Sequence, residues 1–248
     1  MDNFLKYFLK QVIISSMKAS IIIPAYNEEK YIEKTLELAL KQNYPDFEII
    51  VVDNNSTDKT NELARKFDVK VFLEKNKGTL WTRERGRKEA SGEVLAFLDA
   101  DCLPDSDWLR EGVKWFEFDK NVVAVTGPYD YFDSSSWYRF FSMFLQKNIY
   151  SFFNIFLQRI HKGAVLIFGN SFIRASSAEN IGGFNTNITF YGDDTDTAKR
   201  LSKFGKIVFD KKLIIKSSSR RLKKEGMIKI PLLYVLTFFK ILILGERK

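Results

Sequence analysis

Two carboxylates, Asp99 and Asp101, follow an apolar run at Val94–Leu98. The run has the composition of a buried strand, and alternate residues at its end project towards the same side. Paired carboxylate oxygens suit Mg²⁺ or Mn²⁺, and such a cation can bridge a diphosphate and neutralise charge on a leaving nucleotide. Because Asp-x-Asp also occurs often by chance, the pattern gains meaning only from its surroundings.

A second acidic pair, Asp193 and Asp194, precedes a stretch with the composition of a helix, which we predict over residues 195–204. A carboxylate placed there can act as a general base that removes a proton from an acceptor hydroxyl. The alternative is an acidic first turn, which the helix dipole favours without any catalytic role.

Another apolar run, residues 20–23, leads directly into Pro24, Ala25, Tyr26, Asn27 and Glu28. Pro24 fixes the direction in which the chain leaves the predicted strand. The ring of Tyr26 and the carboxylate of Glu28 could then contact a base or a ribose. A strand–Pro–helix junction can also be purely structural.

Residues 48–52 form a similar apolar run that ends at Asp53. The carboxylate of Asp53 can accept a hydrogen bond from a nucleobase ring N–H. Asp53 and Asp58 could instead cap the next helix, because Asp is common at such positions, and Ser56 or Thr57 is a possible N-cap.

Strand-like and helix-like segments alternate through the first half of the chain, which predicts an α/β fold with a mostly parallel twisted sheet flanked by helices. In such sheets ligands bind at the carboxyl ends of the strands, where the acidic residues above would lie. The predicted strands are 20–23, 48–52, 69–73, 94–98 and 122–125, and the predicted helices are 29–42, 57–67 and 81–90. Residues 164–172 are also β-like.

The composition suits a single folded domain, since 45% of the 248 residues are hydrophobic and 28% are charged. Cys102 is the only cysteine, which excludes an intramolecular disulfide and is compatible with a reducing cytosol. The net charge is +8, and basic residues mingle with aromatic ones in residues 134–161. That mixture favours an anionic membrane surface as partner and argues against nucleic acid.

Two further segments bear on the membrane. Residues 228–244 are almost wholly apolar but contain Lys229, Pro231 and Lys240, so a monotopic or re-entrant arrangement is favoured over a span. The alternative is a terminal helix packed on the core of the domain. Residues 1–18 have no signal-peptide cleavage pattern and are interpreted as an extension or an amphipathic helix.

Taken together and in order, from about residue 20 to residue 221, these motifs resemble the family-2 glycosyltransferases, which are inverting enzymes with the GT-A fold. The resemblance implies a Rossmann-like nucleotide-binding half and a UDP- or GDP-linked sugar as donor. It implies that Pro24, Ala25, Tyr26, Glu28 and Asp53 hold the nucleotide, together with an arginine in the helix before the fourth strand, which here is Arg83. Asp99 would approach the ribose or the metal, Asp101 would ligate Mn²⁺ or Mg²⁺, and Asp194, beside Asp193, would be the base.

The chain departs from the family pattern at two places. Around Arg83 the sequence differs from the usual Ala-Arg-Asn, so Arg85 or Arg87 could take over a phosphate contact. The Gln/Arg-x-x-Arg-Trp motif of the processive synthases is also missing, since Arg220-Arg221-Leu222 has no tryptophan. Transfer of a single sugar is therefore expected.

The expected organisation is an extension at 1–18, a transferase domain at 19–222 with an aromatic-rich insert at 134–161, and a membrane-associated segment at 223–248. We expect a peripheral or monotopic protein on the cytoplasmic face of the cell membrane, acting on a lipid-linked or cell-envelope glycan acceptor. Two other functions are weighed: a nucleotidyltransferase that makes nucleotide-sugars, and a non-catalytic membrane adaptor. Against the first, Pro24 to Glu29 contains no glycine-rich phosphate loop; against the second, acidic residues stand at every motif.

Overall fold

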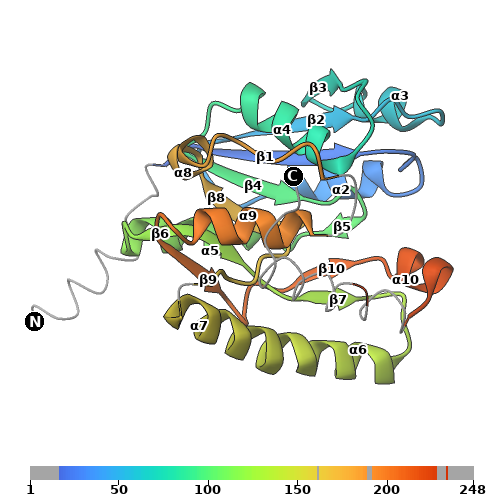
Figure 1. Cartoon of the computed structure of the whole chain (residues 1–248). Coiled ribbons are helices and arrows are strands. Elements are labelled where there is room, and N and C mark those ends of the chain that lie inside the picture. Colours follow the sequence, from blue (N-terminus) through green and yellow to red (C-terminus); the bar gives the residue numbers. More distant parts are fainter. Residues whose placement is uncertain (1–16, 161, 189–191, 228–232, 234–248) are drawn as a thin grey trace, which may run out of the picture.

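The computed structural model describes residues 17–160, 162–188, 192–227 and 233, which form two sheets surrounded by helices (Figure 1). Nearly all of the expected N-terminal extension and of the apolar segment at 228–244 lies outside the described residues. Among the residues described, no helix is both long enough and apolar enough to cross a membrane.

The larger sheet has the strand order β3-β2-β1-β4-β8-β6-β9. It is parallel except for β8, which runs antiparallel to both β4 and β6. Its strands are β1 (Ala19–Ala25), β2 (Phe47–Asp53), β3 (Lys70–Leu73), β4 (Val94–Leu98), β6 (Val122–Thr126), β8 (Asn170–Arg174) and β9 (Lys206–Phe209). The predicted α/β fold with a mostly parallel sheet is confirmed, because fully apolar runs such as Val94–Leu98 are buried on both faces.

The smaller sheet has the order β5-β10-β7 and lies near the carboxyl end of β4 (Figure 1). It consists of β5 (Cys102–Leu103), β7 (Tyr129–Tyr131) and β10 (Ile215–Ser217). These strands are too short for the sequence pattern to have predicted them.

Helices cover both faces of the larger sheet. On one face, α2 (Ile32–Ala39), α3 (Thr60–Ala64) and α5 (Trp108–Phe118) pack on the side chains of Ile21 and Ile23. On the other face, α4 (Thr79–Glu89), α8 (Ala175–Asn180) and α9 (Asp193–Leu201) pack on Ile22 and Phe97. Helix α4 lies so close to β1 that a Cβ on Gly86 would come within 2.3 Å of the Ile22 side chain.

Two local predictions are wrong. Of the β-like residues 164–172, only the end is strand, because β8 begins at Asn170. Helix α3 begins at Thr60, and neither Ser56 nor Thr57 caps it. Both residues are hydrogen-bonded to the loop after β1 instead: the Asn27 N–H donates to Ser56 Oγ and the Thr57 N–H donates to Asn27 Oδ1.

The insert forms one long helical rod along the edge of the molecule (Figure 1), made of α6 (Ser136–Phe144), a π-helical segment η1 (Leu145–Tyr150) and α7 (Ser151–Arg159). Its inward side is polar. Gln146 exchanges hydrogen bonds with the backbone of Tyr129, and Asn154 and Gln158 both donate to the Ile207 carbonyl oxygen. The rod is therefore held to β7 and β9 largely by hydrogen bonds from its side chains, with the buried Leu157 and the contact between the Tyr150 and Phe209 rings adding apolar packing.

The outward side of the rod is apolar. Exposed residues follow one another at steps of mostly three or four, and the single step of five, from Phe144 to Ile149, falls on the π-helical segment. A π turn takes one more residue than an α turn, so it helps to keep the exposed side chains along one side. They are Trp137, Phe140, Phe141, Phe144, Ile149, Phe152, Ile155, Phe156 and Ile160.

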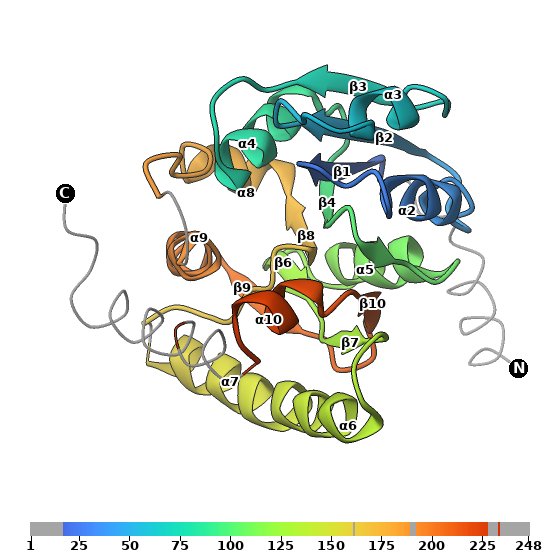
Figure 2. The same ribbon diagram turned by 90° about the vertical axis from the view of Figure 1, so that its right-hand side faces the viewer.

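Figure 2 views the molecule from the side on which β1, β2 and β4 end. The short helix α10 (Arg220–Glu225) lies on this side, in front of the sheets. It follows β10 after two residues, so the smaller sheet determines where it lies.

Candidate functional site

The Asp-x-Asp segment turns sharply at the end of β4. The Cys102 N–H donates to the Asp99 carbonyl oxygen at 2.9 Å. From α2, the Thr35 hydroxyl reaches the carbonyl oxygens of both Ala100 and Cys102, at 2.8 and 3.0 Å. These bonds hold Asp99 and Asp101 at the carboxyl edge of the sheet, as the sequence predicts.

Arg83 of α4 joins the two acidic pairs. Its guanidinium contacts Asp193 Oδ2 at 2.8 Å and Asp99 Oδ1 at 3.2 Å. It stacks on the ring of Phe168, with Cζ 4.2 Å from the centroid, and the residue is 5% exposed. Although burial opposes its charge, Asp99 and Asp193 together keep the pKa of Arg83 above its ordinary value. A fixed positive charge therefore lies between the end of β4 and the start of α9.

The neighbouring arginines face other partners. Arg87 donates two hydrogen bonds to Glu84, and Arg85 pairs with Glu89 at 2.8 Å. Of the three arginines that the sequence left as candidates, Arg83 is the one that contacts Asp99 and Asp193.

The second oxygen of Asp99 is also positioned by the protein. The Tyr129 hydroxyl donates to Asp99 Oδ2 at 3.1 Å. Gly169 approaches so closely that a Cβ there would lie 2.0 Å from the same oxygen. Asp99 is thus fixed on one side by Arg83 and on the other by Tyr129 and Gly169.

Asp193 and Asp194 begin α9 but have different surroundings. Asp193 is paired with Arg83, whereas Asp194 Oδ1 accepts a hydrogen bond from the Phe168 N–H at 3.1 Å. Burial and the nearby Asp193 raise the pKa of Asp194 well above its ordinary value, against the opposing effect of Arg83. A carboxylate with a raised pKa is a stronger base than an ordinary one, which suits a general base.

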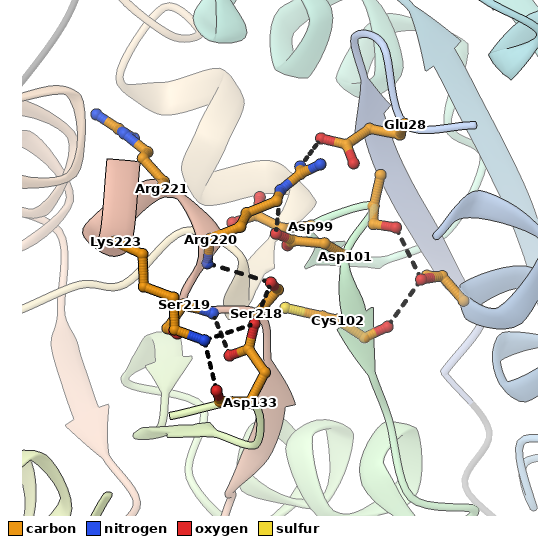
Figure 3. Close-up of polar contacts among 12 residues, drawn as sticks. Glu28, Asp99, Asp101, Cys102, Asp133, Ser218, Ser219, Arg220, Arg221 and Lys223 are labelled. Carbon is orange, nitrogen blue, oxygen red and sulfur yellow. Dashed lines mark hydrogen bonds and ion pairs between the residues drawn. The ribbon is translucent and has the colours of Figure 1, made fainter. Parts of the chain in front are cut away.

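A third group combines the acidic residues Glu28 and Asp101 with Arg220 of α10 (Figure 3). Arg220 Nε lies 3.3 Å from Asp101 Oδ2, and its NH2 group pairs with Glu28 Oε1. Burial, followed by the charge of Asp99, raises the pKa of Asp101 to about 7 although Arg220 opposes the shift. Burial likewise raises the pKa of Glu28.

The loops after β1 and β2 support each other. The Glu28 N–H donates to Thr60 Oγ1 at 2.7 Å, and the Glu29 N–H donates to Asp58 at 3.1 Å. Pro24 and Ala25 are the last residues of β1, and Ala25 is paired in register with Asp53. The nucleotide-binding candidates therefore share one edge of the sheet.

Two residues of this edge differ in exposure. Asp53 is 2% exposed, and its carboxylate accepts from the Ser56 N–H and from Asn61 Nδ2. Tyr26 is 51% exposed, so its ring is accessible. A contact of either residue with a base remains a prediction.

Comparisons with known proteins agree with this geometry. The model of glycosyl transferase family 2 matches residues 20–182. The chain belongs to this family. Glycosyltransferase AglE of Haloferax volcanii is 33% identical over 75% of the chain and 62% of its own length. A dolichyl N-acetyl-α-D-glucosaminyl phosphate glucuronosyltransferase of Methanococcus voltae, whose sugar is a diacetamido-dideoxy derivative, is 35% identical over 40% of the chain and 33% of its own length.

The matched region thus spans less than two thirds of either relative. Among solved structures, mannosyltransferase PcManGT from Pyrobaculum calidifontis, crystallised with GDP-Man and Mn²⁺, aligns with a TM-score of 0.71 and 22% identity. The alignment covers 94% of the chain and 66% of PcManGT. At this identity it shows a shared fold, the GT-A fold that the resemblance implied.

The donor set fits a hard divalent cation that is bound together with a substrate. Asp99 and Asp101 offer carboxylate oxygens, and Glu28 Oε2 is buried without a hydrogen-bond partner among the described residues. Over the same residues, no three side chains of His, Cys, Asp or Glu are grouped closely enough to hold a metal by themselves. Mg²⁺ commonly uses one or two carboxylates and completes its shell with water and substrate phosphates, which matches this arrangement.

The sequence patterns missed three residues of the site: Phe168, Tyr129 and Arg220. Phe168 and Tyr129 carry no motif, since Tyr129 reaches the site through the short strand β7 and Phe168 through the irregular turn before β8. Arg220 carried a signal, because the basic pair Arg220-Arg221 is the place where the chain departs from the motif of the processive synthases.

Proposed function

We propose that this family-2 glycosyltransferase transfers a single sugar, with inversion, from a nucleoside-diphosphate sugar to an acceptor hydroxyl. The observation that carries the proposal is Arg83, which binds Asp99 of the donor-binding edge and Asp193 at the start of α9. This bridge brings a nucleotide-binding edge and a candidate base into one site.

On the donor side, Pro24 and Ala25 shape the edge of the sheet that receives the nucleotide. Tyr26 and Asp53 contact its base. Glu28 and Asp99 contact its ribose. Asp101, with Asp99 beside it, holds Mn²⁺ or Mg²⁺, as the resemblance implies. When bound, the cation supplies positive charge that neutralises the departing nucleoside diphosphate. Arg83 bridges Asp99 and Asp193 through its guanidinium.

On the acceptor side, Asp194 takes the proton from the acceptor hydroxyl as its oxygen attacks the anomeric carbon. The Phe168 N–H fixes one oxygen of Asp194, which leaves the other for the hydroxyl. Asp193 raises the pKa of this base and at the same time anchors Arg83. Attack opposite to the leaving diphosphate inverts the anomeric configuration.

The two alternative functions lose support. Membership of family 2 argues against a nucleotidyltransferase, and the loop from Pro24 to Glu29 still offers no glycine-rich cradle for phosphates. A non-catalytic adaptor would have no need to place the desolvated carboxyl of Asp194 beside Asp193, since desolvation and the neighbouring carboxylate both disfavour its charge.

The helical rod supports a membrane surface as partner. Its polar side is turned inward and its aromatic side outward, the reverse of a helix that packs on a domain in water. Lys147 and Arg159 lie on the same rod and complement anionic lipid, whereas Arg139 is paired with Asp130 at 2.7 Å. We propose that the rod lies in the interface of the cytoplasmic face, with the apolar segment at 228–244 as a second contact.

A hollow of about 480 Å³ beside α6 supports a lipid-linked acceptor. Phe140, Met143 and Phe144 line it together with Lys147 and with the ion pair between Arg139 and Asp130. Apolar side chains next to basic ones suit a hydrocarbon chain that carries a phosphate. A glycan acceptor of the cell envelope built on such a lipid would then reach the carboxylates from the membrane side.

The donor assignment is tested by thermal shift and calorimetry with UDP, GDP and a panel of their sugars, each with and without Mn²⁺. We expect stabilisation by one nucleotide class that depends on the cation, and slow hydrolysis of the matching sugar donor. If no nucleotide binds with any divalent cation, the transferase assignment is wrong.

The membrane assignment is tested with liposomes of mixed neutral and anionic lipid. Trp137→Ser combined with Phe152→Ser removes two of the most exposed aromatic side chains of the rod. Because burying an aromatic side chain is worth roughly 1.5–3 kcal/mol, we expect binding to fall at least about tenfold. Phe118→Ser, at the equally exposed end of α5, is the matched control and should bind as wild type does.

A further inference from the structure

We propose that Arg220 is a diphosphate-binding residue of the donor site, and that it stands in for the cation at Asp101 as long as no nucleotide is bound. The inference rests on the proposed function, since it names a contact of the same donor. It also gives α10 a role that neither the sequence motifs nor the family resemblance assigns.

The smaller sheet brings Arg220 to the Asp-x-Asp segment. Strand β10 pairs antiparallel with β5, with Ser217 opposite Cys102 and Lys216 opposite Leu103. Cys102 directly follows Asp101, so the chain that leaves β10 at Ser217 passes alongside Asp101 and reaches it at Arg220. The contact between Arg220 and Asp101 is a consequence of strand register rather than of a flexible side chain that happens to touch a carboxylate.

A second set of bonds fixes the start of α10 (Figure 3). Asp133 Oδ1 accepts the Ser219 N–H at 2.7 Å, and Asp133 Oδ2 accepts the Ser218 hydroxyl at 2.9 Å. Lys223 lies 3.7 Å from the same carboxylate. The backbone at Arg220 is thus anchored on the loop before α6, and only the side chain needs to change position during binding.

The guanidinium of Arg220 occupies the place where a cation would be needed. It contacts Asp101 Oδ2 at 3.3 Å and pairs with Glu28, and its Cζ lies 4.7 Å from the centroid of the Tyr31 ring. A cation bound at Asp101 competes with the guanidinium for the same oxygen. Arg220 is 38% exposed on its side chain, so it has room to turn away when this happens.

A bound donor gives the displaced guanidinium a new partner. The diphosphate carries negative charge next to the cation, and the planar donor fork of arginine matches phosphate oxygens. Arg220 therefore changes one anion for another: Asp101 in the nucleotide-free site, and a phosphate oxygen in the loaded site. The exchange makes binding of the cation alone weak and binding of cation with diphosphate strong.

The test compares Arg220→Ala with wild type and with Lys224→Ala, an exposed residue of the same helix whose loss changes the net charge equally. Calorimetry measures binding of Mn²⁺ alone, and of UDP, GDP, UMP and GMP in the presence of Mn²⁺. In Arg220→Ala we expect Mn²⁺ alone to bind more tightly, because its competitor is gone. The preference for diphosphate over monophosphate should fall about tenfold, the equivalent of one charged hydrogen bond of about 1.4 kcal/mol.

Two results would overturn the inference. One is an unchanged diphosphate preference in Arg220→Ala, equal to that of Lys224→Ala. The other is a parallel loss of affinity for Mn²⁺ alone, which would make Arg220 a structural support of the carboxylates. If Arg220→Ala does not fold, Arg220→Gln removes the charge while keeping much of the side chain, and a wild-type diphosphate preference in that variant would refute the inference as well.

Failure of the proposed function looks different. In that case wild type itself binds neither UDP nor GDP with Mn²⁺, whereas an error about Arg220 alone leaves wild-type nucleotide binding intact and changes only the comparison between variants.

Discussion

The two ends of the larger sheet treat their carboxylates in opposite ways. At the amino end, Glu48 accepts hydrogen bonds from Ser20, from the N–H and hydroxyl of Ser91, and from Lys70. Burial alone would raise its pKa, but these bonds prevail and lower it to about 2. Glu48 thereby ties together the starts of β1, β2 and β3 and the turn before β4.

At the carboxyl end the balance is reversed. Asp101, Asp194 and Glu28 are half-buried and lie close to other carboxylates, and desolvation raises their pKa values despite Arg83 and Arg220 nearby. The fold therefore holds negative charges there that its own hydrogen bonds do not fully satisfy. Such an arrangement costs stability and makes sense where a cation, a proton or a substrate completes it.

The difference leads to a clear separation of effects. Neutralising a carboxylate at the carboxyl end should damage function and spare or improve stability, whereas neutralising Glu48 should damage stability and spare function. The following substitutions test this separation.

The largest effect is expected for Asp194→Asn. The amide cannot accept the acceptor's proton, so turnover should fall roughly 10²–10⁴-fold. Affinity for nucleotide with Mn²⁺ should stay near wild type. The melting temperature should stay the same or rise, because the substitution removes a charge that desolvation disfavours. Initial rates, calorimetry and thermal melting measure the three quantities. Asp105→Asn, an exposed aspartate after β5, is the control. Nearly full turnover in Asp194→Asn would move the role of base to Asp193 or Asp196.

Asp101→Asn should affect binding rather than the proton transfer. One charged ligand for the cation is lost, so the gain in nucleotide affinity that Mn²⁺ provides should disappear or fall at least about tenfold. The metal-free variant should melt at the same temperature as wild type or higher, since burial and Asp99 disfavour the charge of Asp101. Unchanged dependence on Mn²⁺ would show that Asp101 is not a ligand.

The sequence predicts much of the fold because most strands of the larger sheet are continuous apolar runs. All five predicted strands, 20–23, 48–52, 69–73, 94–98 and 122–125, are present. Four of these runs are largely buried, whereas 69–73 forms the more exposed edge strand β3. By contrast, β5, β7 and β10 have two or three residues each and are defined by pairing over long distances in the chain. No local pattern can predict strands of that kind.

The site shows the same limit. The acidic residues at strand ends could be found from spacing alone, and Arg83 from a resemblance. The contacts that Tyr129, Phe168 and Arg220 make depend on the smaller sheet and on the irregular segment before β8. The sequence also could not predict that the polar side of the helical rod faces the domain, because a segment rich in aromatic residues does not reveal which of its sides packs inward.

A smaller effect, opposite in kind, is expected for Glu48→Gln. The amide accepts fewer hydrogen bonds and cannot pair with Lys70, so the free energy of unfolding should fall by about 1–2 kcal/mol. The melting temperature should then fall about 2–4 °C for each kcal/mol. Turnover and nucleotide affinity should equal those of wild type. Glu33→Gln, on the exposed side of α2, should change neither quantity. Reduced turnover at a temperature where Glu48→Gln is fully folded would break the separation between the two ends.

The smallest effect is expected in how the unfolding free energy of Glu48→Gln, relative to wild type, depends on pH. The pKa of Glu48 in the folded protein is about 2, below its ordinary value of 4.5. Above pH 4.5 the carboxylate is ionised in both states and its stabilisation is complete. As the pH falls below 4.5 the unfolded chain takes up the proton first, so the stabilisation decreases until about pH 2. The difference in unfolding free energy between wild type and Glu48→Gln, measured by urea titration, should therefore be constant from pH 7 to pH 5 and shrink between pH 4.5 and pH 3. A difference that stays constant down to pH 3 would mean that the hydrogen bonds of Glu48 do not depend on its charge, and the contrast between the two ends of the sheet would then rest on the carboxyl end alone.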